Sequence, residues 1–150
     1  MRLTDYTDYA LRTLIHLGMH RDRLVTIQEI ADAYGISKNH LMKVVNQLGN
    51  AGWVETIRGR SGGLRLGKEP DKIVIGKVVR DTEPDFSMVE CFDRERNSCA
   101  LAPACELKNV LKRATLAYLA VLDEVTLADI LKNRATLEKY LPLVFRPRSA

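Results

Sequence analysis

The sequence contains no apolar run of about 18 residues, the length that a membrane-spanning helix needs. Its N-terminal segment carries acidic residues early and lacks the basic start, apolar middle and small-residue cleavage site of a signal peptide. These absences predict a cytoplasmic protein with no membrane association. The length of 150 residues fits one domain, or a small domain with a long appendage.

Common catalytic motifs are also missing. The sequence shows no nucleophile elbow, phosphate-binding loop or paired carboxylates. Ser61 lies in a glycine-rich loop, but no general base is near it in the sequence. We therefore expect that this protein is not an enzyme.

Acidic residues are scarce between residues 36 and 68, where Glu55 is the only one. The same stretch holds six Lys or Arg residues, so its net charge is +5, whereas residues 1–35 carry −1 and residues 69–150 carry 0. The net charge of +4 thus arises from one third of the chain. Such a patch often marks a polyanionic partner, and a solvated surface is the alternative on charge alone.

Two helices joined by a tight turn are predicted in and before this basic stretch. Thr26 followed by Glu29 is a capping box that opens a short helix ending at Gly35. Ser37 is the predicted N-cap of the next helix, which Gly52 ends. This arrangement is typical of a helix-turn-helix.

In a helix-turn-helix, the second helix lies in the DNA major groove and its N-terminal residues meet base edges. Hydrogen-bonding side chains occupy that end of the helix here. They are Ser37, Lys38, Asn39, His40 and Lys43. Many helix pairs with polar faces bind no DNA, so whether this pair binds DNA has to be judged from the segment that follows it.

That segment predicts a β-hairpin, with strands over residues 53–57 and 64–66 and a basic, glycine-rich loop between them. A hairpin directly after a recognition helix is a wing. Arg58, Arg60 and Ser61 at its tip are expected to bind phosphate or enter a minor groove. Together with the local charge, these features predict a mainly α fold with a small β-hairpin wing that binds double-stranded DNA.

The second half of the chain predicts a short helix ended by Pro84, a polar loop, a long amphipathic helix over residues 104–122 and one more short helix over 126–133. A long amphipathic helix outside the DNA-reading part suits a homodimer seam, because operator symmetry mirrors protein symmetry. Packing on its own domain is the alternative. The predicted divisions are a DNA-binding domain (1–83), a cysteine loop (84–105), and a dimerisation helix with a C-terminal tail (106–150).

All three cysteines, Cys91, Cys99 and Cys105, lie in that loop. Their spacing matches neither the tight knuckle of zinc fingers nor a twin-cysteine redox motif. Cytoplasmic thiols stay reduced, and wide spacing in a loop suits a group larger than one ion, such as an iron–sulfur cluster. A zinc-bound module, a reversible disulfide and incidental thiols remain alternatives on spacing alone.

Four features follow one another along the chain in the order in which a known protein family has them. They are the opening MRLTDYTDYALRTLIHL, the wing IRGRSGGLRLGK, the stretch IGKVVRDTEP, and three cysteines before a long helix. In these the chain resembles, over nearly its whole length, the bacterial winged-helix iron–sulfur regulators of the IscR/NsrR family. SKNHLMKVVNQL and PACELK are most similar to the nitric-oxide-sensing branch. The spacing from Cys91 to Cys99 is longer than the commonest family spacing. Because the extra residues fall in a loop, we expect them to be tolerated.

The resemblance implies a cluster, either 2Fe–2S or 4Fe–4S. The implied ligands are Cys91, Cys99, Cys105 and Asp8 of the partner subunit. Arg12 is placed to support Asp8 at i,i+4. Glu90 and Asp93 are the rival oxygen ligands, and on position alone Asp8 does no more than stabilise the helix dipole. The three histidines are poor ligand candidates.

The function implied by the resemblance is that of a cluster-dependent repressor. A homodimer is expected to bind a palindromic, AT-rich operator, to sense nitric oxide, and to derepress nitrosative-stress genes. The alternative is a metal-free thiol/disulfide regulator on the same DNA-binding fold.

Overall fold

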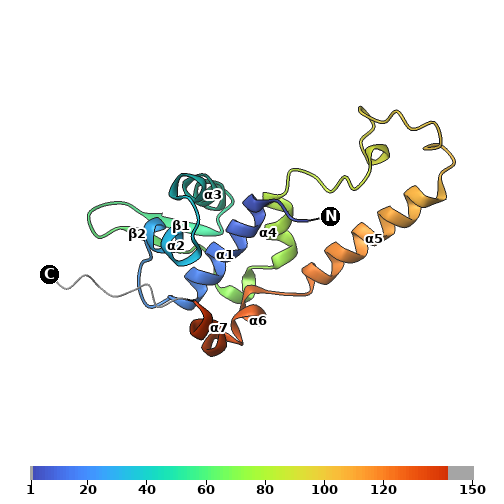
Figure 1. Ribbon diagram of the computed structural model, residues 1–150. Coiled ribbons are helices and arrows are strands. Elements are labelled where there is room, and N and C mark those ends of the chain that lie inside the picture. Colours follow the sequence, from blue (N-terminus) through green and yellow to red (C-terminus); the bar gives the residue numbers. More distant parts are fainter. Residues whose placement is uncertain (1, 142–150) are drawn as a thin grey trace.

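The computed structural model describes residues 2–141, and the remainder of the predicted C-terminal tail lies outside them. The first half contains α1 (Asp5–Met19), α2 (Ile27–Tyr34), α3 (Lys38–Asn50), β1 (Val54–Ile57) and β2 (Gly63–Leu66). The second half contains the short 3-10 turns η1 (Pro70–Lys72) and η2 (Glu90–Phe92), and helices α4 (Ile75–Thr82), α5 (Glu106–Asp123), α6 (Leu127–Leu131) and α7 (Arg134–Tyr140) (Figure 1). The predicted mainly α fold with a two-stranded wing is confirmed.

Helix α1 runs through the middle of the compact body and fixes the position of α3 (Figure 1). Leu14 of α1 and Leu41 and Val44 of α3 have no exposed surface. In addition, the Tyr6 hydroxyl donates a 2.9 Å hydrogen bond to the backbone carbonyl of Lys43. Apolar burial of this kind contributes about 2 kcal/mol per large side chain, so the orientation of α3 is set by the core.

The predicted turn chemistry between α2 and α3 is confirmed at its first half. Thr26 and Glu29 form the reciprocal capping box, and Gly35 adopts a left-handed conformation with φ of 63°. Ser37 stands at the N-cap position of α3, but its side chain makes no capping hydrogen bond. Its hydroxyl is therefore not engaged by the helix end that it precedes.

The wing is an antiparallel hairpin in which Val54 pairs with Leu66. Its tip loop requires glycine at two places. Gly59 has φ of 115°, and a Cβ atom at Gly62 would collide with the backbone carbonyl of Ile57. The hairpin is joined to the body by a short antiparallel bridge between Val25 and strand β2.

Helix α5 projects from the body, and residues 84–105 run from the end of α4 in the body out to the N-terminal end of α5 (Figure 1). Its C-terminal end is anchored, because Leu119 is buried and Asp123 forms a bidentate pair with Arg80 of α4. Helix α6 then returns to the body, where Leu127 has no exposed surface. Part of the segment 106–150 therefore contributes to the core of the N-terminal domain. Helix α7 was not predicted.

None of the helices within residues 2–141 is both long and apolar enough to cross a membrane.

Candidate nucleic-acid interface and cysteine loop

Helix α3 turns a polar face away from the core. Its buried side chains are Leu41, Val44, Val45 and Leu48. The predicted reading residues all lie outside that face and are exposed: Ser37, Lys38, Asn39, His40 and Lys43. The N-terminal end of α3 thus presents hydrogen-bonding groups to the surroundings, as a recognition helix requires.

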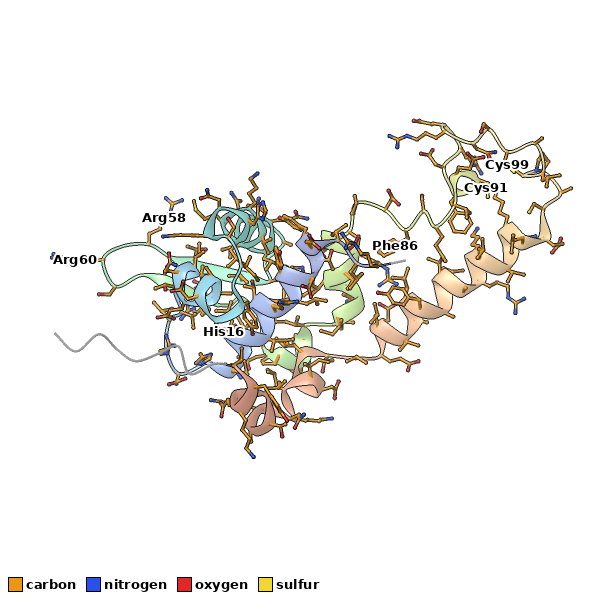
Figure 2. All side chains as sticks on the ribbon, in the orientation of Figure 1. His16, Arg58, Arg60, Phe86, Cys91 and Cys99 are labelled. Carbon is orange, nitrogen blue, oxygen red and sulfur yellow. The ribbon has the colours of Figure 1, made fainter. Side chains whose placement is uncertain are left out.

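The three predicted wing residues, Arg58, Arg60 and Ser61, are exposed as well. Figure 2 shows both arginines on the outer loop of the hairpin, directed away from the body. Because two glycines shape this loop, the arginines sit on a narrow projection that a DNA groove can accommodate.

Charge pairing separates these cations from the others in the domain. Within residues 2–83, Arg58 and Arg60 are the arginines that form no ion pair. Arg65 lies on β2, opposite Glu55 of β1, and is held by that carboxylate at 2.8 Å. In the same described range Lys38, Lys43, Lys68 and Lys77 also form no ion pair, so four of the six unpaired cations lie on α3 and the wing. Unpaired cations are the groups that exchange counterions for DNA phosphates.

The last turn of α4 joins α5, the base of the wing and α3. Arg80 pairs with Asp123 of α5. The carboxylate of Asp81 accepts a 2.7 Å hydrogen bond from the indole nitrogen of Trp53, and its backbone carbonyl accepts one from the Gln47 side chain of α3. The recognition helix is thereby tied directly to α4.

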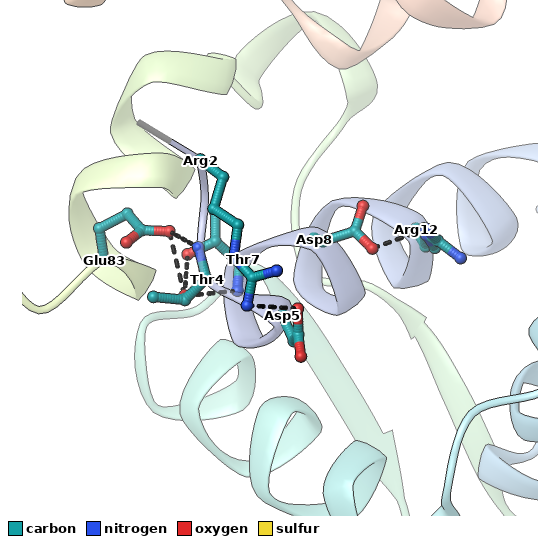
Figure 3. A network of polar contacts seen from close by, with 7 residues as sticks. All are labelled: Arg2, Thr4, Asp5, Thr7, Asp8, Arg12 and Glu83. Carbon is teal, nitrogen blue, oxygen red and sulfur yellow. Dashed lines mark hydrogen bonds and ion pairs between the residues drawn. The ribbon is translucent and has the colours of Figure 1, made fainter.

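The next residue but one, Glu83, ties the same turn to α1 (Figure 3). Its Oε1 accepts hydrogen bonds from the backbone nitrogen of Thr4, at 2.8 Å, and from the Thr4 hydroxyl, at 3.0 Å. Thr4 is the N-cap of α1 and accepts a hydrogen bond from the backbone nitrogen of Thr7. Since the cysteine loop begins at Pro84, the body end of that loop is fixed to α1, α3 and α5 through α4.

Sequence reasoning missed both Asp81 and Glu83. Each is an acidic residue at the end of a short amphipathic helix, where a solvated position is the ordinary expectation. Their partners lie far along the chain, and no local spacing marks the pairs. A tryptophan in a predicted strand was the one usable signal, because a buried indole N–H needs an acceptor.

The three cysteines occupy different local structures in one loop. Cys91 lies in η2, Cys99 lies in an irregular stretch, and Cys105 stands at the N-cap position of α5. All three are half-buried and none forms a disulfide. Figure 2 shows Cys91 and Cys99 at the far end of α5, well away from the wing.

Asp8 lies on α1, in the body, rather than in the cysteine loop. Its Oδ2 is 2.7 Å from the guanidinium of Arg12, so the predicted i,i+4 pair is confirmed (Figure 3). The fold of one chain does not gather the four implied ligands: nowhere in residues 2–141 do three His, Cys, Asp or Glu side chains converge to hold a metal ion. The ligand set with Asp8 of the partner subunit stays a prediction.

The rival oxygen ligands sit nearer the cysteines in the chain and have weak local partners. Glu90 lies 3.4 Å from the hydroxyl of Ser98 through both carboxylate oxygens. Asp93 accepts a 2.9 Å hydrogen bond from the backbone nitrogen of Glu95 and lies 3.6 Å from the guanidinium of Arg96. Neither contact is strong enough to withhold the carboxylate from a metal ion.

The donors present fit a thiolate-bound iron–sulfur cluster. Three thiols without disulfides lie on one loop, and thiolate sulfur is the ligand that such clusters use. Cys105 stands at the N-cap position of α5, so its sulfur lies beside the N-terminal end of an 18-residue helix. A fourth donor has to come from outside these three residues.

Of the three histidines, only His40 lies on α3, and none lies in the cysteine loop. His16 is buried, its ring stacks on that of His20 with centroids 4.5 Å apart, and its Nδ1 has no hydrogen-bond partner. Burial, reinforced by the charge of His20, lowers the pKa of His16 to about 4. His16 is therefore a neutral packing residue at neutral pH.

The family profile of Rrf2, described as iron-dependent transcriptional regulators, matches residues 3–133. The HTH-type transcriptional regulator NsrR of Bacillus subtilis is 57% identical over 144 residues, which cover 95% of this chain and 99% of that protein. The regulator of the same name from Bacillus licheniformis is 58% identical over 142 residues, or 94% and 99% of the two chains.

Solved structures agree with this. The structure of T. potens IscR superimposes with a TM-score of 0.73 at 25% identity, covering 92% of this chain and 91% of that one. CymR, the global cysteine regulator of B. subtilis, superimposes with a TM-score of 0.71 at 30% identity over 88% and 97%. The chain therefore belongs to the Rrf2 family of transcriptional regulators, which are DNA-binding proteins and not enzymes.

Proposed function

We propose that this regulator is a repressor whose hold on its operator depends on an iron–sulfur cluster and is released by nitric oxide. The observation that carries the proposal is the set of three unbonded thiols on one loop, at the end of the long helix that leaves the DNA-binding body. The relatives named NsrR, which match this chain over almost its full length, support it.

In this proposal the cluster is held by Cys91, Cys99 and Cys105 of one chain and by Asp8 of the partner subunit. When bound, it would supply iron that reacts with nitric oxide. Asp8 suits the role because its side chain is only partly buried, and because its contact with Arg12 is made through Oδ2. Arg12 thereby orients the carboxylate while leaving Oδ1 for a second partner.

The chain offers a path from the ligands to the DNA-reading helix. Asp8 lies one turn after Thr4, whose backbone and hydroxyl are held by Glu83 at the start of the cysteine loop. Two residues earlier, Asp81 holds Trp53 and Gln47. A displacement of α1 or of the loop is therefore passed to α3 through hydrogen bonds and a packed core. A tenfold loss of operator affinity needs a coupling of only about 1.4 kcal/mol.

Two copies of the chain would place two α3 helices and two wings on a palindromic, AT-rich operator. Lys38, Lys43, Arg58 and Arg60, the cations of α3 and the wing tip, would neutralise phosphates in each copy, so affinity is expected to fall steeply with salt. Wing arginines favour the narrow minor groove of A·T-rich flanks. The seam between the copies would be the exposed face of α5, where Leu107 and Val121 are each 62% exposed.

Protein purified without oxygen tests the proposal. It is expected to be coloured and to contain iron and acid-labile sulfide. In a gel-shift assay it should bind a DNA duplex that the protein has itself selected from a pool of random sequences. Nitric oxide should change the absorption spectrum and release the duplex in the same titration. Colourless protein that binds the duplex and responds instead to thiol oxidants would favour the metal-free disulfide regulator.

Replacing Asp8 with alanine tests the fourth ligand. We expect an altered absorption spectrum and an altered response to nitric oxide, because the cluster loses an oxygen ligand. Asp5→Ala is the matched control: Asp5 is also a carboxylate in the first turn of α1, and its contact with Arg2 is a loose 3.9 Å. If both variants behave like the parent protein, the fourth ligand passes to Glu90, Asp93 or a small molecule.

A further inference from the structure

An apolar side chain stands in the middle of the polar face of α3. Met42 is 51% exposed, and it is the exposed large hydrophobic residue of the described range 2–83. Helical spacing places it beside residues three and four positions away, which are Asn39, Lys38 and Asn46. The core takes Leu41 and Val44 from another face of the helix, so Met42 is not part of the buried core and about half of its surface stays uncovered.

An exposed methionine contributes no stability to the helix in water. Its position, among polar and cationic side chains, suits a partner surface that is polar and negatively charged but has an apolar group at one point. The floor of the DNA major groove has that character, because the C5-methyl group of thymine is the apolar feature among the donors and acceptors of the base edges. The unpaired cations Lys38 and Lys43 on either side of Met42 would hold the flanking phosphates.

We propose that Met42 contacts a thymine methyl group in each half of the operator and so determines one base of the sequence that the protein reads. The proposal rests on the DNA-binding part of the proposed function and not on the cluster. An unbranched thioether suits this contact because it adapts its shape to the groove floor. Asn39 and Asn46 on either side would add hydrogen bonds, whereas Met42 would add discrimination of thymine from cytosine.

The test uses the full-length protein in its DNA-binding form and a duplex selected by that protein from a random pool. Each thymine is replaced in turn, symmetrically in both half-sites, by deoxyuridine, which lacks only the methyl group. We expect one position at which the parent protein loses about fourfold in affinity per half-site, the value of one buried methyl group. Met42→Ala should bind the parent duplex about as weakly as the parent protein binds the demethylated one.

The deciding comparison is the response of Met42→Ala to deoxyuridine at that position. A response of less than about 1.5-fold is expected, since the variant has lost the side chain that senses the methyl group. Met42→Leu should keep most of the sensitivity, and Asn46→Ala should weaken binding while remaining fully sensitive. The proposal is overturned if Met42→Ala keeps the parent's methyl sensitivity, or if no thymine shows it. A parent protein that binds no duplex at all would instead overturn the proposed function.

Discussion

Replacing Cys99 with alanine is expected to yield a colourless protein that no longer binds its operator, although the chain stays folded. Cys99 is half-buried in an irregular stretch outside every helix and strand, so it contributes little to the core. Its backbone nitrogen donates a 3.1 Å hydrogen bond to the side-chain oxygen of Asn97 and its carbonyl accepts one from the backbone nitrogen of Ala102, and both survive removal of the sulfur. A stability effect above about 1 kcal/mol would therefore be unexpected.

The loss of function is expected to be large because a cluster ligand acts in concert with the others. The three cysteines of this loop are all the thiolate ligands that the chain can supply. With only two of them left, the cluster lacks a complete set of protein ligands. Without the cluster, Asp8 of the partner subunit has nothing to bind, and the coupling through Thr4, Glu83 and Asp81 is no longer set. We expect operator affinity to fall by at least about tenfold, equivalent to about 1.4 kcal/mol.

Ser98→Ala is the matched control for this variant. Ser98 is adjacent, exposed and held only by 3.4 Å contacts to Glu90, so its removal should change neither colour nor binding. Far-ultraviolet circular dichroism and thermal unfolding establish that both variants are folded. Iron, sulfide and the operator titration then decide the matter: a Cys99→Ala protein with unchanged iron content and affinity contradicts the cluster proposal.

Local chemistry explains which parts of the fold were predictable. The capping box at Thr26 and the left-handed Gly35 act within a few residues, and the structure has both as predicted. Of the hairpin-loop glycines expected to supply positive φ, Gly59 does so, whereas Gly62 and Gly63 do not. The i,i+4 pair of Asp8 and Arg12 belongs to the same class. These features depend on residues a few positions apart along the chain, so they can be predicted from the order of the residues.

Long-range pairing explains what was missed. The hydrogen bonds from Trp53 to Asp81 and from Thr4 to Glu83 join residues 28 and 79 positions apart. Helix α7 was not expected because, in the described part of the chain, it buries no residue and so shows no strong apolar stripe.

Helix α5 shows best what the structure adds. Its apolar residues repeat at three and four positions in the sequence, which leaves the dimer seam and the intramolecular face unresolved. The structure divides them into two faces. Thr115 and Leu119 are the buried residues of the helix, and the Thr115 hydroxyl contacts the sulfur of Met88 in the cysteine loop. The exposed stripe has a spacing of three, four, three and four, and it consists of Leu107, Val110, Ala114, Ala117 and Val121. That spacing is the signature of a helix–helix seam.

Placing a charge in the middle of this stripe is expected to separate the two copies and to abolish operator binding. Ala114 lies near the midpoint of α5, and two small residues there permit close approach of a second α5 helix. In Ala114→Glu the two carboxylates would enter the seam near the symmetry axis without a partner. Burying them costs about 3 kcal/mol or more, which weakens the dimer by more than about a hundredfold.

Ala120→Glu is the matched control, because Ala120 is an exposed alanine of the same helix that lies off the stripe. Sedimentation equilibrium should show a dimer for the control and a monomer for Ala114→Glu at micromolar concentration. Operator affinity should fall with the dimer, since a monomer holds one half-site and forfeits the other. A dimeric Ala114→Glu protein with the affinity of the parent would move the seam to another face. It would also leave Asp8 without the second copy that the proposed ligand set requires.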